Sequence, residues 1–223
     1  DENSGSTFKQ WQLGISLAVG KYIWIAESDD KCEEKFLETL VSAMENLDDV
    51  VLTYCQSIEF DEERNIQHNS FQNIPTLYNK RFKKDQHLTK KEEMSNYLLF
   101  NNTIPNASAV LFKKNYAQNI ITDDLIKMKL CGDWLFWIRL LQHGNLYYIS
   151  KPLNYFRYHG DNVRSKSYNN SAHIFDRITL IKEGCTIHKL SYFKKIKAYE
   201  NQLEASMNLS PFFFKIRYPF RNY

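Results

Sequence analysis

Features that would place this chain in a membrane or secreted class are missing from its 223 residues. No hydrophobic run approaches the roughly 20 residues that a membrane-spanning helix needs, and no segment has the pattern of a signal peptide. The sequence also contains no internal repeat and no low-complexity segment. We therefore expect a globular protein of the cytoplasm.

Cysteine is scarce, and the two signs of charge are nearly balanced. The four cysteines (Cys32, Cys55, Cys131 and Cys185) form no CxxC pair and no metal-finger spacing, so we expect reduced thiols in a cytosolic protein. The formal net charge of +3, with a pI near 8.5, is too small to argue for a nucleic-acid partner, and we expect none. Because the chain starts at Asp1 rather than Met, we also expect that the protein's true N-terminus lies further upstream.

What is present is the hydrophobic pattern of an α/β domain, with 43% hydrophobic residues. A helix over residues 7–19 is followed by a short apolar strand at 22–26, which predicts burial on both faces of a parallel sheet. A helix at 33–47 and a strand at 49–54 complete a strand–helix–strand order. Residues 57–86 are polar and predict a long irregular excursion.

The second half of the chain continues this alternation. Thr89 and Glu92 form a capping box that predicts the start of a helix. The further expected elements are a helix to about residue 100, a strand at 107–112, a helix at 134–143, strands at 146–150 and 153–158, and two helices from about residue 171.

Three acids lie within four residues directly after the first apolar strand, in Glu27-Ser28-Asp29-Asp30. One interpretation is a strand-to-helix turn in which Asp30 caps the next helix and the acids favour its positive end. The other is a divalent-cation site, because ligands bind at the carboxyl ends of strands in open α/β sheets and Mg²⁺ or Mn²⁺ prefers carboxylate oxygens. Taken alone, the acids leave both interpretations open.

A second acid, Asp133, opens the tryptophan-rich helix of "GDWLFWIRLLQHG". Asp133 could be an N-cap, or it could be a carboxylate that removes a proton from an attacking hydroxyl. Arg139 lies inside the packed helix, so we expect it to be structural. Further along, "NYFRYHGDNVRSKS" contains His159 and Arg164. His159 could be a ligand or an ordinary polar residue. Arg164 could bind a diphosphate or belong to a solvated basic loop.

The segment "ENSGSTFKQWQLGISLAVGKYIWIAESDD" resembles the family 2 glycosyltransferases of the GT-A fold, whose pattern there is N-x-G, then G-I, A-x-G-x-Y-I and D-x-D-D. Residues 27–30 match the D-x-D-D, with Glu27 in place of the first Asp. Trp11-Gln12 stands where the family often has Arg-Asn. Gly132-Asp133 and the Arg157–Ser165 segment match later family motifs, so the resemblance runs from Asp1 to about Ser165.

The resemblance implies an α/β fold of GT-A (Rossmann-like) type, with a mixed sheet flanked by helices. The family's first strand and first acidic motif have no counterpart here, which implies an N-terminally truncated domain. We expect the GT-A-like domain at residues 1–168 and a helical, basic and aromatic extension at 169–223.

The resemblance also assigns the site residues. Asp29 and His159 would hold Mn²⁺ or Mg²⁺, and Asp133 would be the catalytic base. The donor diphosphate would be bound by Glu27, Asp30 and Arg164. Asn106 and Ser108, on the strand before the base, would face the acceptor. An ordinary strand entrance is the alternative interpretation for either residue alone.

The implied function is an inverting, metal-dependent transfer of a sugar from a nucleotide-sugar donor to a saccharide or lipid-linked saccharide, in cell-surface polysaccharide synthesis. Two rivals remain open: a non-catalytic glycosyltransferase-like module that binds saccharide or a partner, and a nucleotidyltransferase. Residues 210–223 interleave aromatic and basic side chains. That pattern suits peripheral attachment to the inner face of a membrane, although packing of the tail on the domain explains it equally well.

Overall fold

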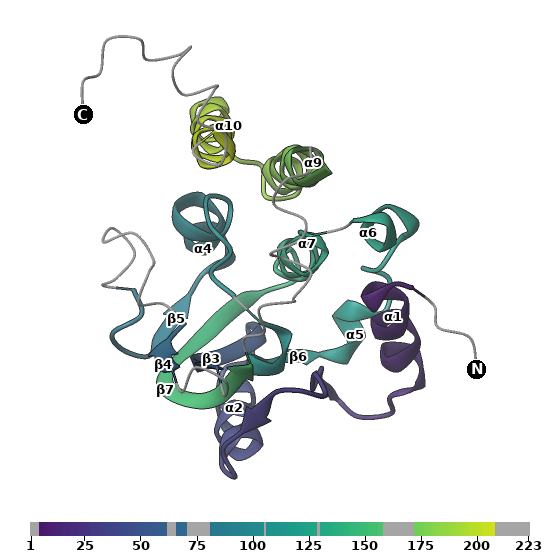
Figure 1. Ribbon diagram of the computed structural model, residues 1–223, viewed down its shortest axis with the longest axis vertical. Coiled ribbons are helices and arrows are strands. Elements are labelled where there is room, and N and C mark those ends of the chain that lie inside the picture. The colour runs from purple at the N-terminus through teal and green to yellow at the C-terminus, as the bar shows by residue number, and fades with distance from the viewer. Residues whose placement is uncertain are drawn as a thin grey trace.

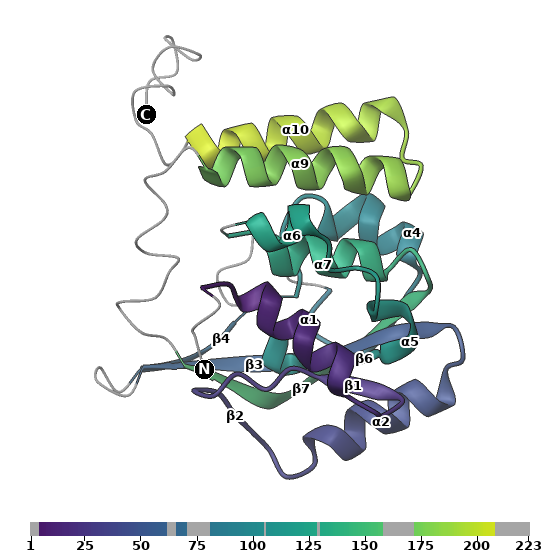
Figure 2. The same cartoon turned by 90° about the vertical axis from the view of Figure 1, so that its right-hand side faces the viewer.

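The computed structural model describes residues 5–61, 66–70, 81–104, 106–128, 130–157 and 172–207. One mixed sheet lies between two unequal helical layers, as Figure 1 and Figure 2 show. Among the described helices, α2 alone covers one face. On the other face several helices lie against the sheet, and the pair α9 and α10 forms a further layer beyond them.

The sheet has the strand order β1-β6-β3-β7-β2, with β4 paired to β3 and β5 paired to β7. Its centre is the parallel pair β3 and β7, and every other pairing is antiparallel. The strands are β1 (Tyr22–Trp24), β2 (Lys31–Cys32), β3 (Val50–Asp61), β4 (Ile66–Asn69), β5 (Gln86–Leu88), β6 (Val110–Lys113) and β7 (Asn145–Arg157).

The first strand departs from its prediction. β1 pairs only with β6, and it does so antiparallel, so it lies at the edge of the described sheet rather than in a parallel interior. Only Ile23 of its three residues is buried. The continuous apolar run therefore does not correspond to burial on both faces. Tyr22 and Trp24 lie on the α2 side of the sheet and pack only partly against the core beneath α2.

Helix α2 (Phe36–Asn46) covers its face of the sheet with one apolar stripe. Phe36, Leu40 and Met44 are all buried, as the spacing of an amphipathic helix predicts. They form a core cluster with Ala109, which directly precedes β6, and with the buried strand residues Val50, Cys55, Leu111, Ile149 and Leu153.

The opposite face carries the larger core. Its central helix, α7, is buried along almost its whole length, which is why its sequence is apolar on every side. The helices on this face are α1 (Thr7–Leu17), α4 (Lys90–Glu93) running into the π-helical turn η1 (Met94–Leu98), α5 (Lys114–Ala117), α6 (Asp123–Lys127) and α7 (Gly132–Leu140).

Helices α9 (Ala172–Ile187) and α10 (Tyr192–Met207) form a hairpin that packs on this layer (Figure 2). Leu180, Ile181 and Ala198 belong to the same core cluster as α7. The two predicted C-terminal helices are therefore confirmed. The proposed domain boundary at 168/169 and the aromatic tail at 210–223 lie outside the described residues.

Of the polar stretch 57–86, where we expected an irregular loop, residues 57–61 and 66–69 are strand. β3 continues to Asp61, paired with β7 on one side and β4 on the other. Backbone pairing on both sides keeps these polar residues extended, whatever their side chains. The two strands expected at 146–158 are likewise one strand, β7, which crosses Pro152 with a shift of register.

Arg139 has the structural role that we expected. Its guanidinium donates to Glu183 of α9 at 2.5 Å and to Asp124 of α6 at 2.5 Å, and also to Thr122 and the Ile120 carbonyl. One side chain of α7 thus ties both neighbouring helices to the core. All four cysteines are free thiols, and none of the described helices has the length and apolar character to cross a membrane.

Candidate active site

The three acids form a turn directly after β1, which we call the acid turn (residues 27–30). The Asp30 N–H donates to the Glu27 carbonyl at 3.2 Å, and the chain then enters β2. Helix α2 begins only at Phe36, with Lys35 as its N-cap. The interpretation of Asp30 as a helix cap is therefore wrong, because a short strand separates the acids from the helix.

Glu27 is half-buried, and its backbone N–H donates to the Ser108 hydroxyl oxygen at 3.1 Å. Burial raises the pKa of the Glu27 carboxyl, and the charges of Asp30 and Asp29 raise it further. A hydrogen bond from the Trp11 side chain acts the other way and favours the carboxylate.

Asp30 is also half-buried. Its Oδ1 accepts the Arg157 backbone N–H at 3.0 Å, whereas its Oδ2 is buried without a hydrogen-bond partner in the described part of the chain. Burial raises the pKa of Asp30, while hydrogen bonds from the Ser108 hydroxyl and the Arg157 backbone lower it. A buried oxygen without a donor is suited to a cation.

The described residues fit a cation held by few protein ligands. Over these ranges no cluster of three or more His, Cys, Asp or Glu side chains could enclose a metal ion. Mg²⁺ commonly uses only one or two carboxylates together with substrate phosphates, so the half-buried pair Glu27 and Asp30, beside exposed Asp29, is compatible with it. His159 and Arg164 lie outside the described residues.

Asp133 lies in the first turn of α7, and Cys131 is the N-cap of that helix. The capping interpretation of Asp133 is therefore wrong. The Asp133 side chain is half-buried. Its Oδ2 accepts a hydrogen bond from the Asn102 side-chain amide at 3.4 Å. Sequence reasoning did not identify Asn102, because nothing local connects it to α7.

Helix α1 lies between the acid turn and Asp133 of α7. Trp11 is buried in the core, where its ring meets Phe136 at 5.5 Å and Trp137 at 6.0 Å between ring centroids. The Gln12 side chain donates to the Ile121 carbonyl at 2.9 Å. The two residues that replace the family's Arg-Asn pair are thus engaged within the chain itself.

Asn106 and Ser108 lie in the segment that leads into β6, including the 3-10 turn η2 (Ala107–Ala109). Both are buried, and both reach other parts of the site: Ser108 the acid turn, and Asn106 the side chains of Ser57 and Asn154. Sequence reasoning missed Ser57 and Asn154, for which the only signal is a polar residue inside a strand. Contact of Asn106 or Ser108 with an acceptor stays a prediction.

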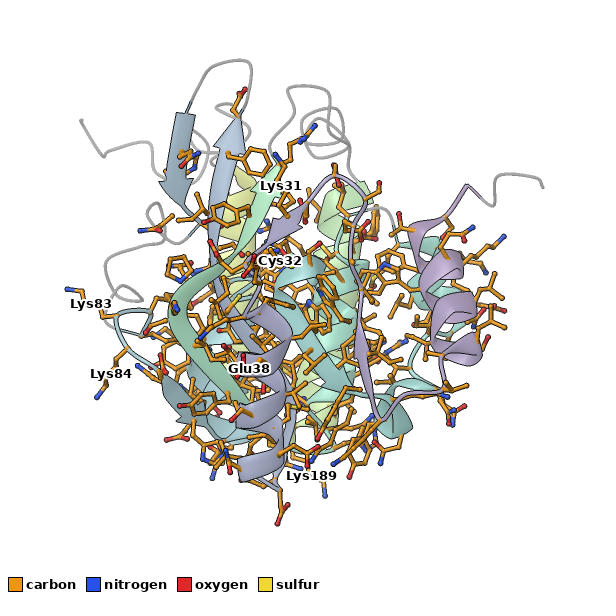
Figure 3. All side chains as sticks on the ribbon, turned by 90° about the horizontal axis from the view of Figure 1, so that it is seen from below. Lys31, Cys32, Glu38, Lys83, Lys84 and Lys189 are labelled. Carbon is orange, nitrogen blue, oxygen red and sulfur yellow. The ribbon has the colours of Figure 1, made fainter. Side chains whose placement is uncertain are left out.

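A hollow of about 650 Å³ lies beside β2, on the side of the sheet that α2 covers. Figure 3 looks onto that side and shows Lys31 and Cys32 beyond the start of α2, whose first turn is marked by Glu38. Phe60, Tyr155, Lys35 and Lys151 also line it. Lys31, which lines the hollow, follows Asp30 directly in the sequence. Asp133, by contrast, belongs to the helical layer on the opposite face of the sheet.

Comparison with known proteins decides the family. The model of the family described as Glycosyl transferase family 2 matches residues 2–115, which is about half of the chain and includes the acid turn. The chain belongs to glycosyltransferase family 2. The comparison with curated proteins found no match for this chain.

Solved structures similar to this family 2 chain confirm its fold. Residues 1–349 of TarS from S. aureus match with a TM-score of 0.59 at 13% identity, covering 94% of this chain and 54% of that one. The same fragment in complex with UDP-GlcNAc matches with a TM-score of 0.62 at 13% identity, over 93% and 55% of the two chains. The chain therefore spans about half the length of these structures, and the predicted GT-A fold is confirmed.

Proposed function

We propose that this glycosyltransferase carries out an inverting, metal-dependent transfer of a sugar from a nucleotide-sugar donor to a saccharide or lipid-linked saccharide. The supporting observation is the acid turn, which lies in the region that the family model matches. There Asp30 has a buried oxygen with no hydrogen-bond partner among the residues that the structure describes. The solved structure of the similar TarS fragment with UDP-GlcNAc supports a nucleotide-sugar as donor.

In this proposal Asp29 would be the principal metal ligand, and Glu27 and Asp30 would bind the donor diphosphate with it. His159 would be a further ligand, and Arg164 would neutralise diphosphate charge. A bound Mn²⁺ or Mg²⁺ would supply charge stabilisation for the departing diphosphate. Glu27 and Asp30 would be ionised in that state, because the cation offsets the burial that raises the pKa of each.

Asp133 would act as the general base. Its carboxylate would take the proton of the acceptor hydroxyl while that oxygen attacks the anomeric carbon, and the bond from this carbon to the diphosphate would break with inversion. The Asn102 amide that donates to Asp133 Oδ2 would hold the carboxylate in orientation. A base on α7 and diphosphate-binding acids after β1 would then lie on opposite sides of the sugar.

The substitution Asp133→Asn tests this proposal in the complete protein. We expect transfer to fall by a factor of about 10²–10⁴, since general-base catalysis contributes that much, while Mn²⁺-dependent donor binding persists. Asp123→Asn in α6, another first-turn acid, is the matched control and should keep full activity. Unchanged turnover of the Asp133→Asn variant would remove Asp133 from the role.

One observation favours a second candidate, a module that binds saccharide or a partner without catalysis. The positions of the family's Arg-Asn pair hold Trp11, which is a core residue, and Gln12, which is bound to the Ile121 carbonyl. Calorimetry with UDP-sugars and Mn²⁺ separates the candidates, because a docking module should show no metal-dependent heat. The first proposal, the catalytic one, also includes a saccharide or lipid-linked acceptor. It further includes a role in cell-surface polysaccharide synthesis and peripheral attachment to the inner face of the membrane.

A further inference from the structure

Ser108 is hydrogen-bonded to the start of the acid turn. The Ser108 hydroxyl accepts the Glu27 backbone N–H at 3.1 Å, and the same hydroxyl lowers the pKa of the Asp30 carboxyl. Its own carbonyl accepts the Trp24 indole N–H at 2.8 Å, which ties Ser108 to β1. With 1% of its surface exposed, Ser108 is enclosed by the protein. Ser108 thus ties the start of the acid turn and β1 to the segment before β6.

Asn106 is enclosed in the same way. Its amide nitrogen donates to the Ser57 hydroxyl and to Asn154 Oδ1, both at 3.0 Å, and its oxygen accepts the Ala109 N–H at 2.8 Å. Only 6% of its surface is exposed. Both ends of the amide are therefore used inside the protein, which leaves an acceptor hydroxyl little to bind.

The Asn106 network extends to the chain that follows the acid turn. The Asn154 amide nitrogen donates to the Lys31 carbonyl at 3.3 Å, and the Ser57 hydroxyl donates to Asn154 Oδ1 at 2.8 Å. Lys31 comes directly after Asp30. Side chains from β3, β7 and the segment before β6 thus hold the exit of the turn, while Ser108 holds the turn itself.

We propose that Ser108 and Asn106 are positioning residues that hold the acid turn in the shape that binds the cation and diphosphate. This inference rests on the proposed function and gives it a supporting layer of residues. Three carboxylates within four residues repel one another, so the turn needs fixed donors to keep them together before a cation arrives. Groups that orient metal ligands typically change metal affinity 10- to 100-fold when they are removed.

Ser108→Ala in the complete protein tests the assignment. Electron paramagnetic resonance measures free Mn²⁺ in a titration, with and without UDP. We expect the Mn²⁺ affinity of Ser108→Ala to fall about 10-fold or more, with the KM for the acceptor unchanged. Ser57→Ala, which removes one arm of the Asn106 network, should weaken Mn²⁺ binding less.

Thr53→Val is the matched control. Thr53 is a fully buried residue of β3 whose hydroxyl has no hydrogen-bond partner in the described chain, so its loss should leave Mn²⁺ binding unchanged. Melting temperatures show that each variant is folded. If the parent protein binds Mn²⁺ and Ser108→Ala binds it equally well while its acceptor KM rises, Ser108 is an acceptor contact and the assignment is overturned. A parent protein that binds no Mn²⁺ in either condition would instead overturn the proposed function itself.

Discussion

The ring of Phe8 lies so close to Gly132 that a methyl group on Gly132 would come within 2.2 Å of Phe8 Cε2. Gly132 opens α7 immediately before Asp133, and Phe8 belongs to α1. The absence of a side chain at this one position therefore lets the two helices pack closely beside the candidate base.

We expect Gly132→Ala to lower the free energy of unfolding by about 1–3 kcal/mol, because the added methyl group overpacks this contact. Turnover should fall as well, since the displaced helix start carries Asp133. Chemical denaturation and a transfer assay measure the two effects. In a Phe8→Ala background the added methyl group has no ring to meet. Gly132→Ala should therefore lower the unfolding midpoint less in that background than it does in the parent protein.

Gly14→Ala is the control for this prediction. Gly14 lies inside α1, where an added methyl group meets nothing within 4 Å. Alanine is the better helix former, so this variant should gain up to about 1 kcal/mol. Equal behaviour of the two glycine variants would show that the contact between Phe8 and Gly132 is not tight.

Arg139→Met should lower the free energy of unfolding by about 2–3 kcal/mol, because charged hydrogen bonds to α6 and α9 are lost together. Urea denaturation measures the loss. Hydrogen exchange should also show faster opening of α9, whose Glu183 loses its partner. Lys182→Met, an exposed change on the same helix, should alter stability little. A loss no greater than that of Lys182→Met would contradict the structural role of Arg139.

His188 should make stability depend on pH. Its ring nitrogen lies 3.0 Å from the Ile138 carbonyl, and burial lowers the pKa of His188 below its ordinary value of 6.5. The unfolded chain therefore binds the proton more readily than the folded one. The stability that neutral His188 contributes is fully present above pH 6.5. It is lost as the pH falls through the pKa that His188 has in the folded protein.

In the parent protein the free energy of unfolding should fall as the pH drops from 6.5 to the pKa of folded His188, and His188→Gln should reduce this slope. A single group can contribute at most about 1.4 kcal/mol per pH unit to the slope. Thermal melts across this range measure it. His143→Gln, at an exposed histidine, should change the slope less. A slope that survives in His188→Gln would assign the pH dependence to other groups.

Lys189→Gly should stabilise the protein by about 1 kcal/mol. Helix α9 ends in a Schellman motif, in which the Leu190 N–H donates to the Cys185 carbonyl and the Lys189 N–H to the Thr186 carbonyl. Lys189 has a φ of 50°, a left-handed conformation that costs a residue with a Cβ atom more than it costs glycine. Lys197→Gly in the middle of α10 should lose about 1 kcal/mol instead, and denaturation curves compare the two.

Local patterns in the sequence predicted most elements. The capping box at Thr89 and Glu92 is present, and helices α1, α2, α7, α9 and α10 lie close to where hydrophobic spacing placed them. The pairing of β1 was wrong, because an apolar run does not reveal whether a strand lies at an edge or in the interior of a sheet. The roles of Asp30 and Asp133 as helix caps were also wrong, because each helix takes a different residue as its N-cap.

By itself the sequence determined the family, the α/β architecture and the positions of the acids in the chain, since these follow from motifs and from short-range periodicity. Only the tertiary structure decided what surrounds the acids. Ser57 and Asn154 are 97 residues apart in sequence, yet the parallel register of β3 and β7 places their side chains 2.8 Å apart. Because strand register sets such contacts across the whole domain, no local pattern showed that buried serine and asparagine side chains hold the acid turn.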